Sequence, residues 1–499
     1  MLQSDPVQVP FAEWLPDLPD YKNTGATVAR NVIPDARSYL SLKALSAVTT
    51  TALSARARGG VACFDSARVA YNYAGDATKL YTQAAQIWTD VTNLGGNYSL
   101  ATAENWEFII WGQKVIAVAI DEAPQIITMG GANFADLGGS PPKARHIGIV
   151  GQFVVMANLD ESGTLTPNKV RWSGINNEAT WAASASTQAD SQSLYAPADY
   201  GGGWIMKVIG GSEYGLVFQE YAIWRMTYVG SPTVFSFDVI SNGIGTPAKN
   251  SVVSVGEKVF FLGQDGFYVT TGGLPVSISH DRISRTFLAD VDTANYNRVV
   301  GAVDPKSHII VWIYPSTDSD GTPDKAIIYD YINNKFSDAV FDSQWIYSGL
   351  GAGYTLETLD NINSSIDAHT TSLDAEEYKG GSLILAAFDT SHQKATFTGT
   401  ALAATIETAE TEILPGKRSL VDGVRPIIEG DGVTITITIS TRNKTNEMVT
   451  ASSAISPESG TNISHFRSEG RYHRAKVSTT GSFDHAVGCE FYARPTGRR

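Results

Sequence analysis

The sequence predicts an all-β fold: a β-propeller of about six blades, then a C-terminal β-sandwich-like domain, with an extended N-terminal arm in front. Short runs of apolar and β-branched residues recur along the middle of the chain, each followed by a turn and a second run. The runs begin about every 40–50 residues, which is typical of propeller blades. They occupy residues 69–73, 115–120, 153–158, 214–219, 259–262 and 308–314. An all-β sandwich with irregular strands is the alternative for this pattern.

Turn chemistry supports hairpins inside these repeats. Asp265 and Gly266 lie directly between two apolar runs, and Asp-Gly favours a tight hairpin because its residues accept positive φ angles. Most hairpins are followed by a third short run, at residues 88–92, 134–137, 235–240, 276–279 and 335–341. Since a blade contains about four strands, we assign residues 60–344 to the propeller.

The chain on either side of residues 60–344 lacks the repeated strand pattern of the propeller. Residues 1–59 have no clear core pattern, and their prolines indicate an extended arm that docks on another partner: Pro6, Pro10, Pro16, Pro19 and Pro34. Residues 345–400 are predicted to be a connector with an additional hairpin, for which a further blade is the alternative, and positions 356–373 have helix-length spacing. Residues 433–439 alternate Val or Ile with Thr, as a half-buried strand does, so residues 401–499 are assigned to the sandwich-like domain. The polar segment 184–203 is expected to be an insertion loop, and it is our candidate for a gate.

Composition restricts the class of protein. The 499 residues carry a net charge of −14, which argues against a surface that grips duplex DNA, because phosphate binding relies on clustered Lys and Arg. Cys63 and Cys489 cannot form a disulfide framework or a Cys-rich zinc module. The first 21 residues lack a secretory leader pattern, and no apolar run has the ~18 residues of a membrane span. We therefore expect synthesis and assembly in a cytoplasm.

Motifs for metals, cofactors and nucleophiles are missing from the sequence, so we predict no catalytic, cofactor-binding or metal-binding residue. Of the eight histidines, His465 and His473 are the closest pair, but their spacing is not a ligand motif. The segment from Asp318 to Asp324 places oxygens as a calcium loop does, yet Tyr329 stands where such a loop needs Glu. A solvated hairpin loop is the favoured interpretation.

The main enzymatic alternative is a propeller glycosidase or lectin, which would use paired carboxylates and a Trp that stacks on sugar. The candidate acids are Glu104, Glu107, Glu220 and Asp265, and Glu220 is close in sequence to Trp224. A strand-end carboxylate is more often solvated, so we do not favour this alternative. Seven tryptophans are spread over the blades, which fits core packing better than one binding face: Trp106, Trp111, Trp172, Trp181, Trp204, Trp224 and Trp312.

Several segments resemble the tail-nozzle family of short-tailed bacteriophages, also described as tail tubular protein B or the packaged-DNA-stabilisation protein. They span roughly residues 25–480, and none of them is a catalytic signature. The segments are Ala29-Arg-Asn-Val-Ile-Pro34, Asn133-Phe-Ala-Asp-Leu137, Pro142-Lys-Ala-Arg145, Val170-Arg-Trp-Ser-Gly-Ile-Asn176, Tyr214–Gln219, Trp224-Arg-Met-Thr-Tyr228, Phe260-Phe-Leu-Gly-Gln-Asp-Gly-Phe-Tyr268, Arg285-Thr-Phe-Leu-Ala-Asp290 and Gly470-Arg-Tyr-His-Arg474.

The resemblance implies a non-enzymatic virion protein: one subunit of a ring, typically a homo-hexamer, in the viral tail. The ring would lie below the portal-adaptor (neck) proteins and beside the tail fibres or tailspikes. Its channel would retain packaged double-stranded DNA and pass it into the host during ejection, without sequence-specific binding. The acidic composition is consistent with such a role, because an acidic channel repels phosphate and lets DNA slide.

Overall fold

The computed structural model is nearly all-β, with 51% of residues in strands and 4% in helices. It describes residues 6–21, 23–84, 86–196, 202–304, 306–351, 365, 372 and 381–496. None of the helices in this part of the chain has the length and apolar character required to span a bilayer. The helical segments are short: α1 (Ser284–Asp290) and the 3-10 turns η1 (Lys249–Ser251) and η2 (Thr293–Arg298).

Six consecutive sets of four antiparallel strands form blades 1 to 6 of a β-propeller, as predicted. Blade 1 consists of β6 (Gly60–Phe64), β7 (Ala70–Gly75), β8 (Leu80–Ala84) and β9 (Ile87–Asp90). Blade 2 consists of β10 (Glu107–Trp111), β11 (Lys114–Ala119), β12 (Glu122–Thr128) and β13 (Ala135–Asp136). Blade 3 consists of β14 (Lys143–Val150), β15 (Phe153–Glu161), β16 (Thr164–Trp172) and β17 (Asp190–Ser193).

Blades 4, 5 and 6 repeat this arrangement further along the chain. Blade 4 consists of β18 (Ile205–Ile209), β19 (Tyr214–Gln219), β20 (Ala222–Gly230) and β21 (Val234–Asn242). Blade 5 consists of β22 (Val253–Val255), β23 (Lys258–Leu262), β24 (Phe267–Thr270) and β25 (Val276–Ser277). Blade 6 consists of β26 (Val300–Asp304), β27 (Ile309–Tyr314), β28 (Lys325–Asp330) and β29 (Lys335–Val340).

The central strands of the blades are buried on both faces because a neighbouring blade packs on each side. In β11, Val115 and Ala117 belong to a core cluster shared with blade 1, whereas Ile116 and Val118 belong to a cluster shared with blade 3. A period of two therefore sends alternate side chains to opposite interfaces, and both sets are apolar. This explains why these strands have no polar face in the sequence.

The propeller contains a seventh blade, which includes the additional hairpin predicted within residues 345–400 and replaces the connector predicted there. Its strands are β30 (Trp345–Leu350), β31 (Leu383–Phe388), β32 (Lys394–Thr396) and β5 (Ser46–Ala47). The innermost strand β30 contacts both β26 and β6, so this blade lies between blades 6 and 1 and closes the ring. The fourth strand comes from the N-terminal segment, and so local spacing could not reveal it. The helix-length spacing at 356–373 lies outside the described residues, as do residues 197–201 of the expected insertion loop.

The N-terminal segment is extended as predicted, but it docks on its own chain. Its strands are β1 (Val7–Pro10), β2 (Val28–Arg30), β3 (Val32–Pro34), β4 (Tyr39–Ser41) and β5. β1 and β4 pair with β39, β2 lies between β29 and β33, and β5 pairs with β32. Backbone donors and acceptors of this segment are thus satisfied by sheets formed elsewhere in the chain.

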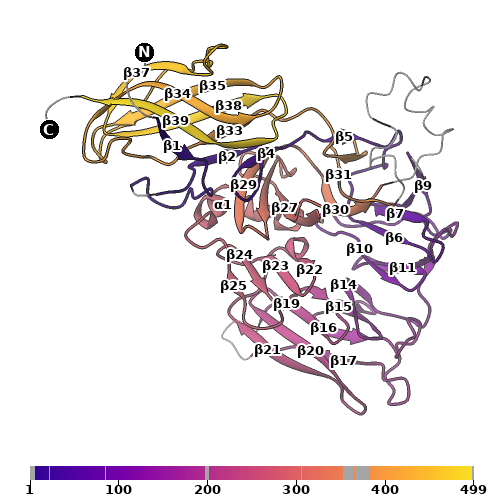
Figure 1. Ribbon diagram of the computed structural model, residues 1–499. Helices are drawn as coiled ribbons and strands as arrows, with labels where there is room; N and C mark the ends of the chain where they lie inside the picture. Colours follow the sequence, from indigo (N-terminus) through magenta and orange to yellow (C-terminus); the bar gives the residue numbers. More distant parts are fainter. Residues whose placement is uncertain are drawn as a thin grey trace.

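The C-terminal strands form two sheets, which we call the platform: β33 (Ala404–Glu407), β34 (Ser419–Glu429), β35 (Thr434–Arg442), β36 (Thr450–Ala451), β37 (Ser464–Gly470), β38 (Tyr472–Thr480) and β39 (His485–Pro495). Ile437 and Val477 from one sheet share a buried cluster with Val424 and Phe491 from the other. Figure 1 shows the platform in yellow as one body and the blades as another, with β2 and β4 in indigo between them.

One sheet runs without interruption through both bodies. Blade 6 is extended by β2 on its outer strand β29, and β2 then pairs with β33 of the platform, giving a nine-stranded sheet. The Arg30 guanidinium forms an ion pair with Asp338 of β29 at 2.7 Å. Asn31, at φ 58°, accepts a bond from the Val340 amide and donates one to the Ala403 carbonyl, both at 2.8 Å. The N-terminal segment therefore fastens the propeller to the platform.

Candidate functional site at the propeller axis

Charged side chains gather where the innermost strands of the blades begin. The first strand of each sheet lies innermost, since β6, β10, β14 and β18 contact one another in turn. Residues at the start of these strands therefore meet at one end of the propeller axis. The charged ones are Arg56, Arg58, Glu104, Glu107, Arg145, His146, Lys207, Lys249 and Arg298.

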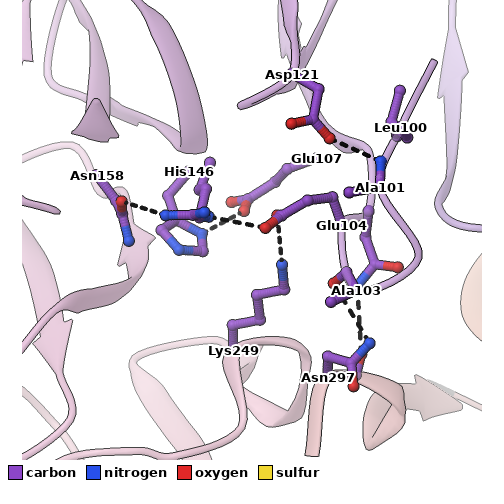
Figure 2. A network of polar contacts seen from close by, with 12 residues as sticks. Leu100, Ala101, Ala103, Glu104, Glu107, Asp121, His146, Asn158, Lys249 and Asn297 are labelled. Atoms are coloured by element: carbon purple, nitrogen blue, oxygen red, sulfur yellow. Dashed lines mark hydrogen bonds and ion pairs between the residues drawn. The ribbon is translucent and has the colours of Figure 1, made fainter. Parts of the chain in front are cut away.

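Glu104 is held between cations from blades 3 and 5. Its carboxylate accepts bonds from Arg145 Nε at 3.0 Å and from Lys249 Nζ at 3.2 Å. Burial would raise the pKa of Glu104, but the charges of Lys249 and Arg145 outweigh burial and lower it. Arg145 also donates to Asn158 Oδ1 at 2.9 Å. Figure 2 shows Glu104 pointing toward Lys249, with Glu107 beside His146.

Glu107 lies deeper and is also paired twice. His146 Nδ1 is 2.9 Å and Lys207 Nζ 3.0 Å from its carboxylate oxygens. Burial opposes ionisation, but Lys207 and His146 lower the pKa of Glu107 to about 2. Burial also lowers the pKa of His146, while the hydrogen bond and charge of Glu107 oppose this shift. Its buried Nε2 has no partner among the described residues.

These two carboxylates are unsuited to general acid catalysis. A glycosidase acid needs a raised pKa so that it carries a proton near neutral pH. Glu104 and Glu107 both have lowered pKa values and are each bound by two basic groups. Their geometry instead joins blades 2, 3, 4 and 5 around the axis. Glu107 and Lys207 also line a pocket of about 510 Å³ between β10, β14 and β18.

The other candidate acids do not form a pocket with an exposed Trp224. The Trp224 indole is buried and donates to Gln219 Oε1 at 2.7 Å. Glu220 accepts the Trp204 amide at 3.1 Å, and Asp265 accepts the Tyr268 hydroxyl at 2.8 Å. Both carboxylates thus serve local turns, as expected for solvated strand ends.

Trp204 differs from the expectation that the tryptophans are core residues. Its side chain is 51% exposed, whereas Trp106 and Trp312 are buried. The Arg145 guanidinium lies 5.5 Å from the centre of its ring, so Trp204 stands beside the charged network. Three glycines precede it in the sequence, Gly201 to Gly203. They were the one available signal that this Trp is not a strand-core residue.

No group of three or more His, Cys, Asp or Glu side chains suited to a metal occurs in the described part of the chain. His473 is buried against the Ser419 hydroxyl at 2.9 Å, whereas His465 lies on the surface near Glu458. In the calcium-like loop, both Asp324 carboxylate oxygens bind Ser316. The loop is therefore organised by its own hydrogen bonds.

Comparisons with known proteins give likeness in fold only. No protein-family model and no curated protein matches the chain. The Neurospora crassa Pan2 WD40 domain matches with a TM-score of 0.38 and 8% identity, over 73% of this chain and 99% of that one. BamB from Moraxella catarrhalis matches with a TM-score of 0.35 and 10% identity, over 79% and 97%. The extracellular domain of a hybrid two-component system from B. thetaiotaomicron matches with a TM-score of 0.40 and 10% identity; 78% of this chain covers 44% of that one. The chain's own seven sets of four antiparallel strands, six of them separate sheets and one part of the nine-stranded sheet, establish the propeller.

Proposed function

We propose that this chain is a structural virion protein, one subunit of the tail-nozzle ring of a short-tailed bacteriophage, and that it is not an enzyme. The observation that supports the proposal is the position of the segment Ala29–Pro34, which is one of the segments that resemble that family. Within it, Arg30 and Asn31 bind both β29 of the propeller and the start of the platform. The segment that carries the resemblance is therefore the one that fastens the two bodies together.

A structural role under pressure accounts for the polar contacts between blades at the propeller axis. In a nozzle, the subunit resists the pressure of packaged DNA, so its blades must not slide apart. Ion pairs between successive blades serve this purpose, since Glu104 and Glu107 are each bound by groups from two other blades. Another segment that resembles the tail-nozzle family acts similarly: Asn133 of blade 2 donates to the Thr92 carbonyl of blade 1 at 2.8 Å.

The ring assembles with the portal-adaptor proteins above it and with fibres or tailspikes at its side. At −14 per chain, the assembled ring repels duplex DNA, which passes through its channel without being held. Assembly takes place in the host cytoplasm, and the mature protein is located in the virion tail.

Electron microscopy and solution mass of the chain mixed with the portal-adaptor complex test this proposal. The expected result is a closed six-fold ring on the adaptor, which increases the mass of the adaptor complex by six 53.5-kDa chains. A chain that stays monomeric in the presence of the adaptor would overturn it. Duplex DNA at physiological salt is expected to leave both the ring and its mass unchanged.

A propeller that binds or hydrolyses carbohydrate is the second candidate, and exposed Trp204 beside Glu220 is the observation that favours it. An exposed Trp near a carboxylate is a common platform for sugar rings. Binding to a glycan array that is lost in Trp204→Ala and retained in Trp181→Phe, a buried control, would favour this function over the nozzle.

A further inference from the structure

Three arginines at the axis, Arg56, Arg58 and Arg298, lack an acidic partner; we call them the arginine triad. Arg56 and Arg58 precede β6 of blade 1, and Arg298 ends η2 just before β26 of blade 6. Within the described ranges, no carboxylate forms an ion pair with any of the three. By contrast, each of the neighbouring basic residues Arg145 and Lys249 binds Glu104.

The triad is bound to backbone carbonyls instead. Arg58 Nη1 donates to Leu100 O at 3.2 Å and to Ala101 O at 2.5 Å. Arg56 Nη2 donates to Thr102 O at 3.3 Å, so both guanidinium groups lie against the same loop. Arg298 Nη1 donates to Gly321 O at 2.5 Å. These neutral acceptors orient the guanidinium groups but supply no negative charge.

A hydrogen-bonded contact brings Arg298 to the same place. Asn297 Nδ2 donates to Ala103 O, and Asn105 Nδ2 donates to Asn297 O, both at 3.3 Å. Figure 2 shows Asn297 reaching the loop beside Ala103. Residue 298 therefore sits next to the loop that Arg56 and Arg58 hold.

The nearby carboxylates are already engaged by other groups. Asp121 accepts the Ala101 amide at 2.8 Å, and Asp76 accepts the Ser54 hydroxyl at 2.7 Å and the Tyr81 hydroxyl at 3.0 Å. Glu104 is neutralised by two cations, as described above. The positive charge of the triad thus has no counter-charge within ion-pair distance in the described residues.

Burial makes this imbalance costly. Arg58 is only 9% exposed, and the Nε–H groups of Arg58 and Arg298 are buried without a partner. Burial, Arg298 and Arg58 together lower the pKa of Arg56 to about 10. Three like charges brought together in a partly desolvated place are destabilising unless an anion joins them.

We propose that the arginine triad binds a small tetrahedral oxyanion of the phosphate class. Planar guanidinium groups donate pairs of N–H bonds that match phosphate oxygens, and the free Nε–H groups are unused donors. The anion could come from free phosphate, a phosphomonoester or a DNA backbone. The burial of Arg58 favours the small free anion, because a duplex cannot reach a recessed guanidinium.

Thermal unfolding of the full-length chain in potassium phosphate, against potassium chloride at the same ionic strength, tests the proposal. Phosphate is expected to raise Tm by about 2 °C or more in a saturable manner. Arg56→Gln and Arg298→Gln are expected to lose this rise. In chloride, Arg56→Gln should unfold at or above the wild-type temperature, because it relieves repulsion.

Arg285→Gln is the matched control, since Arg285 is exposed and, among the described residues, forms an ion pair only with Asp281; it should keep the phosphate-dependent rise. A wild-type chain with no rise in phosphate would overturn the proposal, as would a rise that persists in Arg56→Gln. A short DNA duplex at equal phosphate concentration should leave Tm unchanged. A rise with the duplex alone would assign the triad to DNA and would overturn the small-anion proposal.

Discussion

Blades 1 to 6 differ from blade 7 and the platform in how far apart in the sequence their paired strands lie. In blades 1 to 6, the four strands of each blade are consecutive in the sequence, and neighbours within a blade pair with each other. In blade 7 and the platform, pairing spans most of the chain: Thr396 pairs with Ser46, and Phe491 with Val7. Local pairing thus supplies the body of the propeller, while distant pairing closes it and joins it to the platform.

Removing residues 1–47 is the strongest test of this difference and should have the largest effect. The deletion takes away five strands and the buried side chains of Phe11, Trp14 and Tyr39. We expect amide hydrogen exchange in blade 7 and the platform to approach that of an unfolded chain. Blades 2 to 5 should retain much of their protection, since all of their strands remain.

An unchanged exchange rate in β39 after the deletion would contradict this expectation, because β1 and β4 pair with that strand. Full-length Leu274→Ala serves as a control, since Leu274 is largely exposed in blade 5. Its exchange pattern should match that of the wild type throughout.

The same division explains how much could be predicted from the sequence. Apolar runs around β11, β15, β19 and β27 gave the blades correctly, because each run is adjacent to its partners. In blade 7 the hairpin of β31 and β32 was predicted, but the outer strand was not, because Ser46–Ala47 has no strand pattern of its own. Two-residue strands gain their structure from the sheet they join.

The sequence indicated the acids of the axial network but not their basic partners. Glu104 and Glu107 were identified as candidate acids, but nothing local indicated that Lys249 and Lys207 come from other blades. Their lowered pKa values depend on these distant cations, so their function could not be inferred from the acids alone. The arginine triad was missed for the same reason.

Trp312→Ala tests whether the propeller and the platform share one hydrophobic core. We expect it to have the second-largest effect on stability. The indole is fully buried, donates to Ser251 O at 2.8 Å, and lies 4.6 Å from the Phe267 ring. Its loss should lower the free energy of unfolding by about 3–5 kcal/mol. Because its cluster includes platform residues such as Val477, propeller and platform should unfold in one calorimetric transition, whereas two separate transitions would show independent cores.

Lys394 links the stability of blade 7 to pH. Its buried Nζ donates to Gln83 Oε1 at 2.8 Å and to Leu350 O at 2.9 Å, which satisfies the two N–H groups of a neutral amine. Burial lowers the pKa of Lys394 to about 7. Between pH 7 and 10.5 the unfolded chain binds more protons than the native chain, so the unfolding free energy should rise with pH in that window.

Denaturant titrations of wild type and Lys394→Met across this window measure the effect. The wild type should gain a few kcal/mol in unfolding free energy over the window, and the variant should lose most of that slope. An equal slope in both proteins would mean that Lys394 keeps its proton in the folded state. Lys258→Met, at an exposed position in blade 5, should keep the wild-type slope.

Substitutions of Asn31 should have the smallest effect on the free energy of unfolding. They separate the contribution of the Asn31 side-chain bonds to the propeller–platform junction from that of its backbone angle. At φ 58° a residue with a Cβ is strained, and Asn tolerates this region better than Ala. Asn31→Ala also loses the bonds to Val340 and Ala403, so we expect a loss of about 2 kcal/mol in unfolding free energy. Asn31→Gly removes the same bonds but accepts the backbone angle, and should recover about 1 kcal/mol relative to Ala. If both variants unfold like the wild type, the junction depends on β2 pairing alone; if they are equally destabilised, the side-chain bonds carry the whole effect.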